Sequence, residues 1–86
     1  AVITGPLGTQ SWAGFEDTDA LVALKDHADV VFVGTGADIA HLPDPVLDAL
    51  QEVGLAVEAM ASPAACRTYN VLLSEGRRVA LALIPV

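Results

Sequence analysis

The 86-residue sequence predicts a single α/β domain in which strands and helices alternate. Three observations support this fold class. Short β-branched runs alternate with stretches of helical period, and Gly or Pro marks most of the boundaries between them. Apolar residues make up 53% of the chain, which excludes disorder. Because crossovers between strands are right-handed, we expect most strands to be parallel, with a first or last strand free to run the other way.

The chain opens with a predicted strand over residues 1–4, which the Gly and Pro residues of 5–8 end in a turn. Residues 9–17 are predicted to form a loop with Trp12 and Phe15 as its apolar anchors. Residues 1–4 lack the basic start of a targeting peptide. We interpret residues 1–4 as a strand that has been shortened by trimming.

A helix is predicted over residues 17–27 and a buried strand over residues 29–33. The helix starts among capping-type residues, Asp17 to Asp19, and has an apolar inner face. That face consists of Ala20, Leu21 and Leu24. The strand is predicted from the run "VVFV" before "GTG", because continuous β-branched and aromatic residues are typical of a strand buried on both faces.

The stretch "PDPVLDALQEVG" contains the clearest helix. We expect Asp44 as its N-cap, Pro45 as its first helical residue and Gly54 as its left-handed C-terminal stop. The inner face is Val46, Leu47, Leu50 and Val53. The exposed face carries carboxylates at a spacing of four residues, which is typical of a solvated surface. A strand follows over residues 55–60.

The stretch "SPAACRTYNVLLSEG" repeats the same logic. Ser62 is expected to cap the helix, Pro63 to begin it and Gly76 to end it. The last strand is predicted over residues 77–86, with Pro85 ending its pairing.

The charge distribution excludes two classes of partner. The net charge is −7: residues 1–66 carry Lys25 against ten acids (−9), and residues 67–86 carry three arginines against Glu75 (+2). Nucleic acid and anionic membrane surfaces would repel such a chain. No apolar run is long enough for a membrane span. A single cysteine favours a reducing compartment, so we expect a cytoplasmic protein. A small anionic ligand near the C-terminal arginines remains compatible with the sequence.

The motif "GTGADIAH" follows a predicted strand and invites comparison with phosphate-binding loops. Gly34 and Gly36 fit such a loop, but Ile39 stands where the dinucleotide fingerprint needs a third glycine. There is no Walker lysine either. We therefore interpret "GTG" as a tight turn and expect no nucleotide cofactor.

Cys66 is expected in the first helical turn after Ser62, beside Arg67. Helix N–H groups and a guanidinium both favour a thiolate, so a reactive thiol is one hypothesis. The alternative is a small buried hydrophobe, which free cysteine often is. His27 and His41 cannot be placed near Cys66 from the sequence, and their spacing predicts no metal site.

Taken together, "FVGTG", "GLAVEAM" and above all "ACRTYNVLLSEGRRVALALIP" resemble a family of domains of unknown function found in bacteria, archaea and eukaryotes. The family includes the adipogenesis-associated domain protein and mitochondrial respiratory complex I assembly factor 3. The resemblance covers nearly all of residues 1–86. Members of this family usually carry additional strands before the position of Ala1, and we expect these strands to be missing or trimmed here.

The resemblance implies a three-layer β/α domain with a mixed central sheet and no established catalytic activity. It also implies a pocket between the "GTG" turn and the "CRTYN" helix start. The candidate pocket residues are Gly34, Thr35, Gly36, Cys66, Arg67, Thr68, Tyr69 and Asn70.

Two functions follow as hypotheses. The first is a non-enzymatic binding or assembly module, cytoplasmic or, in the eukaryotic organelle branch, mitochondrial, with a protein partner or self-association. The second is a small enzyme or a redox- or ligand-responsive domain. In that case Cys66 is the reactive thiol, Arg67 holds an anionic substrate and the Gly34–Gly36 backbone donates to an oxyanion.

Overall fold

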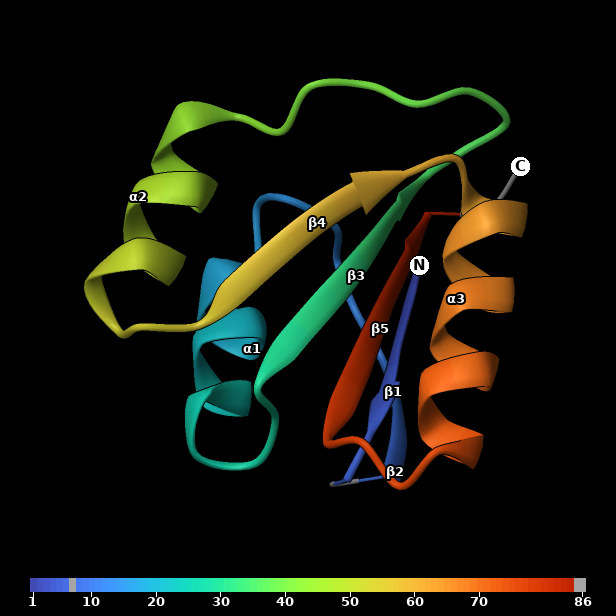
Figure 1. Cartoon of the computed structure of the whole chain (residues 1–86). Coiled ribbons are helices and arrows are strands. Elements are labelled where there is room, and N and C mark those ends of the chain that lie inside the picture. The colour runs from blue at the N-terminus through green and yellow to red at the C-terminus, as the bar shows by residue number, and fades with distance from the viewer. Residues whose placement is uncertain (7, 85–86) are drawn as a thin grey trace.

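The computed structural model describes residues 1–6 and 8–84, and these residues form three layers. A central sheet separates α1 (Thr18–Val22) and α2 (Asp44–Glu52) on one face from α3 (Ser62–Ser74) on the other (Figure 1). The predicted three-layer α/β architecture is therefore confirmed.

The sheet has five strands in the order β2-β1-β5-β3-β4. Their bounds are Val2–Gly5 for β1, Gly8–Ser11 for β2, Val30–Thr35 for β3, Ala56–Met60 for β4 and Val79–Ile84 for β5. Strand β3 pairs in parallel with both β4 and β5, whereas β1 is antiparallel to β5 and to β2. The sheet is thus mixed, as expected, and β2 and β4 form its two edges.

Each face of the sheet has its own hydrophobic core. The larger core lies on the face of α1, α2 and a 3-10 helix, η1 (Ala23–Asp26). Its buried members include Ile3, Trp12, Leu21, Leu24, Val31, Val33, Val46, Leu50 and Ala82. The smaller core lies under α3 and consists of Phe32, Ala65, Tyr69, Val79 and Leu81. Neighbouring residues of β3 and β5 enter opposite cores, because side chains alternate across a strand.

The predicted helix over 17–27 is present in two parts. It starts as α1 and tightens into η1, and Leu21 and Leu24 of its expected inner face are fully buried. The three later elements predicted as helix, strand and helix appear as α2, β4 and α3. Gly54 and Gly76 have φ angles of +75° and +80°, so both glycines provide the left-handed stops that the sequence predicts.

The prediction of a loop over residues 9–17 is wrong at its start, because residues 8–11 form β2. All four residues of β2 are exposed, and none is a large apolar residue. An edge strand of this composition shows no hydrophobic alternation, which is the signal that predicts strands. Trp12 and Phe15 do act as anchors, with ring centroids 5.7 Å apart in an edge-to-face arrangement.

Both predicted N-caps are wrong by one residue. Asp44 and Ser62 are the first helical residues, and Pro43 and Ala61 precede them as caps. The reason is that the first helical carbonyl acceptors belong to the cap residues: Leu47 N donates to Pro43 O, and Ala65 N to Ala61 O. Neither Asp44 nor Ser62 makes a side-chain capping bond. The predicted role of Pro85, and part of the predicted turn at Leu7, lie outside the described residues.

Candidate functional site

The "GTG" turn and the start of α3 are brought together, as the candidate site requires, and Ser62 joins them. Gly36 N donates to Ser62 Oγ at 2.9 Å, and Ser62 N donates to Gly36 O at 2.7 Å. The Ser62 hydroxyl in turn donates to Ile84 O at 2.6 Å, at the end of β5. Ser62 is only 3% exposed. One buried side chain therefore ties the end of β3, the start of α3 and the end of β5.

Glycine is required at position 34 by close packing. A Cβ added to Gly34 would lie 2.7 Å from Ser62 Oγ and 2.9 Å from Ser62 Cα. Gly36 has a φ of +102°, a conformation that favours glycine, and it turns the chain out of β3. The close packing at Gly34 and the positive φ of Gly36 explain why glycine stands at both positions of this turn.

Thr35, between the two glycines, organises the loop that follows. The single proton of its hydroxyl is shared between Asp38 O at 2.8 Å and Met60 O at 3.1 Å, and its oxygen accepts from Ala40 N at 3.0 Å. The loop after β3 is thereby held against the end of β4.

The five α3 candidates do not share one surface. Tyr69 is 9% exposed and belongs to the smaller core, and Cys66 is half-buried and packs against that core. Thr68 is half-buried, and its hydroxyl donates to Met60 Sδ at 3.5 Å, on the β4 side. Arg67 and Asn70 are exposed. Cys66 lies in the second turn of α3 and not in the first, because the helix begins at Ser62.

Neither histidine lies on the Cys66 side of the sheet. His27 follows η1, and His41 lines a pocket with Val57 and Ala59, which pack against the larger core. Cys66 packs against the smaller core on the opposite face. In the described ranges, no group of three or more His, Cys, Asp or Glu residues is placed to hold a metal ion.

Arg78, one of the C-terminal arginines, contacts backbone carbonyls of another segment. Arg78 donates from Nη2 to Asp26 O at 2.9 Å and from Nε to His27 O at 3.4 Å. Within residues 1–6 and 8–84, neither Arg77 nor Arg78 is within 4.0 Å of the Glu75 carboxylate. Arg78 thus fastens the end of η1 to the start of β5.

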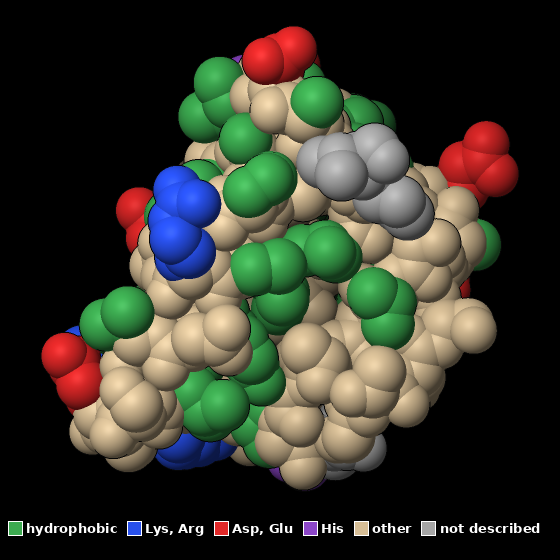
Figure 2. Space-filling view, turned by 90° about the vertical axis from the view of Figure 1, so that its right-hand side faces the viewer, with side chains coloured by type: hydrophobic (Ala, Val, Ile, Leu, Met, Phe, Trp, Pro, Cys, Tyr) green, Lys and Arg blue, Asp and Glu red, His purple; other side chains and the backbone are tan. Residues whose placement is uncertain are grey.

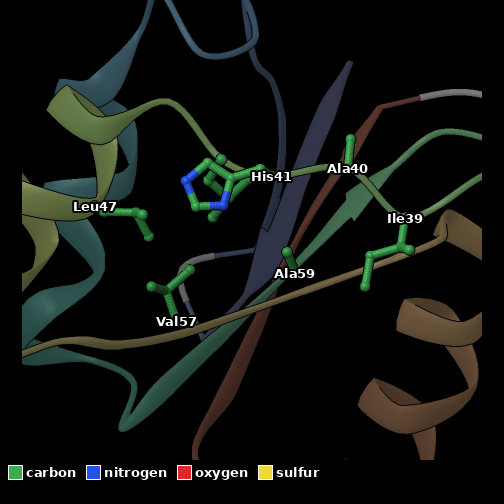
Figure 3. A pocket seen from close by; sticks show the side chains of 7 residues that line it. Ile39, Ala40, His41, Leu47, Val57 and Ala59 are labelled. Carbon is green, nitrogen blue, oxygen red and sulfur yellow. The ribbon is translucent and has the colours of Figure 1, made fainter.

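The sequence interpretation missed a pocket beside β4. It has a volume of about 440 Å³ and is lined by Ile39, Ala40, His41, Leu42, Leu47, Val57 and Ala59. Figure 3 shows the side chains of the 39–41 loop above β4, with Leu47 of α2 at one end. Ile39 is 68% exposed, although it is strongly apolar. The sequence signal that could have indicated this pocket is an isoleucine in the polar loop that follows "GTG".

A second pocket, of about 370 Å³, lies on α3 and is lined by Arg67, Thr68, Val71 and Leu72. Two of the candidate residues therefore border a recess, but on the helix and away from the "GTG" turn. Val71 is 56% exposed. Figure 2 shows the α3 side of the molecule, where hydrophobic side chains gather across the centre and charged ones lie at the periphery. Among the described helices, none is long and apolar enough to cross a membrane.

Comparison with known proteins places this architecture in one family. A family model described as "Protein of unknown function (DUF498/DUF598)" matches residues 1–84. An uncharacterised protein of Rhodobacter capsulatus is 51% identical over 75 residues, which are 87% of this chain and 60% of that protein. The solved structure of a protein from Bordetella parapertussis superposes with a TM-score of 0.85 at 34% identity, covering 99% of this chain and 78% of the other.

A named relative comes from Danio rerio. It is "NADH dehydrogenase [ubiquinone] 1 alpha subcomplex assembly factor 3", 38% identical over 85 residues, which are 99% of this chain and 49% of that protein. The chain thus spans about half to three fifths of the length of these two relatives. It belongs to the DUF498/DUF598 family, as the resemblance of its motifs implies.

Proposed function

We propose that this chain is a non-enzymatic protein-binding module that acts in the assembly of a larger protein complex. The observation that carries the proposal is the pair of apolar recesses bordered by exposed aliphatic side chains, Ile39 at one and Val71 at the other. Aliphatic side chains left in water at the rim of a recess are typical of interaction sites.

The name of one relative supports the assembly part of this proposal. The Danio rerio relative is named an assembly factor, and assembly factors act by contacting other proteins. A shared fold does not by itself carry a function from one protein to another. The assembly role of this chain, and its cytoplasmic or mitochondrial location, are therefore part of the proposal.

The alternative function, an enzyme or redox domain based on Cys66, has less support. Cys66 is half-buried against the smaller core, and both histidines lie on the other side of the sheet. Without a base nearby, a thiol lacks the partner that cysteine hydrolases use. Three expectations remain predictions: a pocket between "GTG" and "CRTYN", an anionic ligand in it, and self-association of the chain. Light scattering over a range of protein concentrations tests the self-association.

Site-specific photocrosslinking in cells that express the chain tests the protein-binding function. A photoreactive phenylalanine analogue replaces Ile39 or Val71, and the same analogue at exposed Gln51 of α2 is the matched control. We expect one cellular protein to crosslink from position 39 or 71 and not from 51, and the Cys66→Ser variant to retain that crosslink. Equal crosslinking from all three positions, or none from any of them, would contradict the proposal.

A further inference from the structure

We propose that the free edge of β4, together with the pocket beside it, receives an extended basic segment of the partner protein. The segment adds to the sheet as a sixth strand and places an apolar side chain in the pocket. This inference rests on the proposed protein-binding function and names the chemistry of the partner.

Strand β4 has a strand neighbour on one side only among the described residues. In the described part of the chain, β4 pairs with β3 alone, and Ala56 and Glu58 are exposed. An edge strand of this kind presents N–H and C=O groups that an extended peptide can satisfy. The other edge, β2, has no recess among the pockets described, so β4 combines a free edge with a pocket.

The pocket lies where an added strand would direct its side chains. Val57 and Ala59 of β4 form its floor, and Leu47 and Ile39 stand beside it (Figure 3). Side chains alternate across a strand, so every second residue of an added strand would point toward the α2 face of the sheet. The lining is mostly aliphatic, and the side chain that it accepts is therefore apolar.

The charges on the segments that form the pocket and on β4 itself indicate the remaining side chains of the added segment. Between Lys25 and Arg67 the chain contains no Lys or Arg. Residues 36–60 carry five exposed carboxylates: Asp38, Asp44, Asp48, Glu52 and Glu58. Within the described ranges, no Lys or Arg side chain lies within 4.0 Å of them. A segment in which Lys or Arg alternates with Val or Leu complements both the apolar lining and this charge.

A second copy of the chain fits the same edge poorly. If two β4 strands paired about a twofold axis through their centres, Glu58 of one copy would lie opposite Glu58 of the other. Like charges directly opposite each other destabilise a strand pair. The acidic edge therefore discriminates against self-pairing and favours a basic partner.

The probe for this inference is the fluorescently labelled peptide Lys-Val-Lys-Leu-Lys-Val-Lys, with binding measured by anisotropy and located by amide chemical shifts. We expect shifts in β4 and the 36–43 loop. N-methylation of alternate peptide amides provides a matched pair: methyl groups on the amides that face β4 should weaken binding about tenfold or more, and methyl groups one residue out of register should have little effect. The same peptide with glutamate for lysine should not bind.

Two matched pairs of protein variants separate specific docking from general attraction. Glu58→Lys and Glu75→Lys change the net charge equally. We expect Glu58→Lys to weaken binding about two- to fivefold and Glu75→Lys to leave it nearly unchanged. Ile39→Ser should weaken binding in the same way, and Val71→Ser should not.

Three results would overturn the inference: no binding at about millimolar peptide, equal effects of both N-methyl registers, or equal effects of the two glutamate variants. The photocrosslinking experiment keeps the two proposals apart. A partner captured from position 71, together with a peptide that does not bind, would refute docking at β4 and leave the protein-binding function in place.

Discussion

Ser62 is the residue on which the geometry of the candidate region depends. Its hydroxyl accepts from Gly36 N and donates to Ile84 O, and its own N–H donates to Gly36 O. These three hydrogen bonds connect segments that are far apart in the sequence. Because Ser62 is buried, water cannot replace its hydroxyl once the side chain is removed.

Replacing Ser62 with alanine should therefore lower the free energy of unfolding by about 1–3 kcal/mol, since the Gly36 N–H and the Ile84 carbonyl both lose a partner. Urea unfolding measures this change. The matched control is Ser74→Ala in the same helix. The Ser74 hydroxyl is exposed and donates only to Val71 O, so its loss should change the stability by less than about 0.5 kcal/mol. Equal losses in the two variants would show that the buried bonds contribute nothing specific.

At the scale of the elements, the predictable ones share a hydrophobic pattern. Strands β3 and β5 are continuous apolar runs, the helices α2 and α3 have apolar residues at helical spacing, and the structure contains all four. Strand β2 lacks that signal, because its sequence "GTQS" is exposed throughout. Strand β2 forms because it pairs with β1. The four residues of β2 alone do not predict this pairing, which depends on the neighbouring strand.

Hydrogen exchange should rank the strands accordingly. We expect the amides of β3 and β5 to exchange slowest, because both strands are paired on two sides and largely buried. The amides of β2 should exchange fastest among the strands, since β2 is paired with β1 alone and buries no side chain. Amide-resolved exchange followed by nuclear magnetic resonance measures this order. Equal protection in β2 and β3 would mean that the sheet opens only as a unit.

At the scale of the whole molecule, the charge is strongly unbalanced. A net charge of −7 on 86 residues makes the folded chain repel itself. One exposed contact between oppositely chargeable groups is found among the described residues, His41 Nε2 to Asp44 Oδ1 at 3.6 Å. It is an ion pair only when His41 is protonated, and it offsets little of this repulsion.

Added salt should therefore stabilise the fold. Raising NaCl from about 0.01 to 0.15 M shortens the screening length to about 8 Å, and we expect the melting temperature to rise by a few degrees. The double variant Asp48→Asn/Glu52→Gln removes two carboxylates from the exposed face of α2 and changes the net charge of the chain from −7 to −5. Its melting temperature should rise less with added salt. Calorimetry measures both. A melting temperature that falls with salt would indicate that attractive charge pairs dominate.

The candidate site was less predictable than the fold, because the site depends on how the whole chain is arranged. The layers follow from local patterns, but the contact between Gly36 and Ser62 depends on which strands become neighbours. The pocket beside β4 is formed by α2, β4 and the 39–42 loop together, and no one of these segments indicates it. The family resemblance brought residues 34–36 and 66–70 into one hypothesis. The structure shows that Ser62 makes the link.

The position of β5 has a consequence for synthesis on the ribosome. Strand β5 follows the other four strands in the chain, yet it lies between β1 and β3 at the centre of the sheet (Figure 1). Until it emerges, the β1–β2 hairpin and the β3–β4 pair have no common neighbour. At about 5–20 residues per second, these two half-sheets spend about one to five seconds as separate nascent pieces with apolar faces in water. The domain therefore closes in a single late step, and during that interval nascent-chain chaperones have two incomplete apolar surfaces to protect.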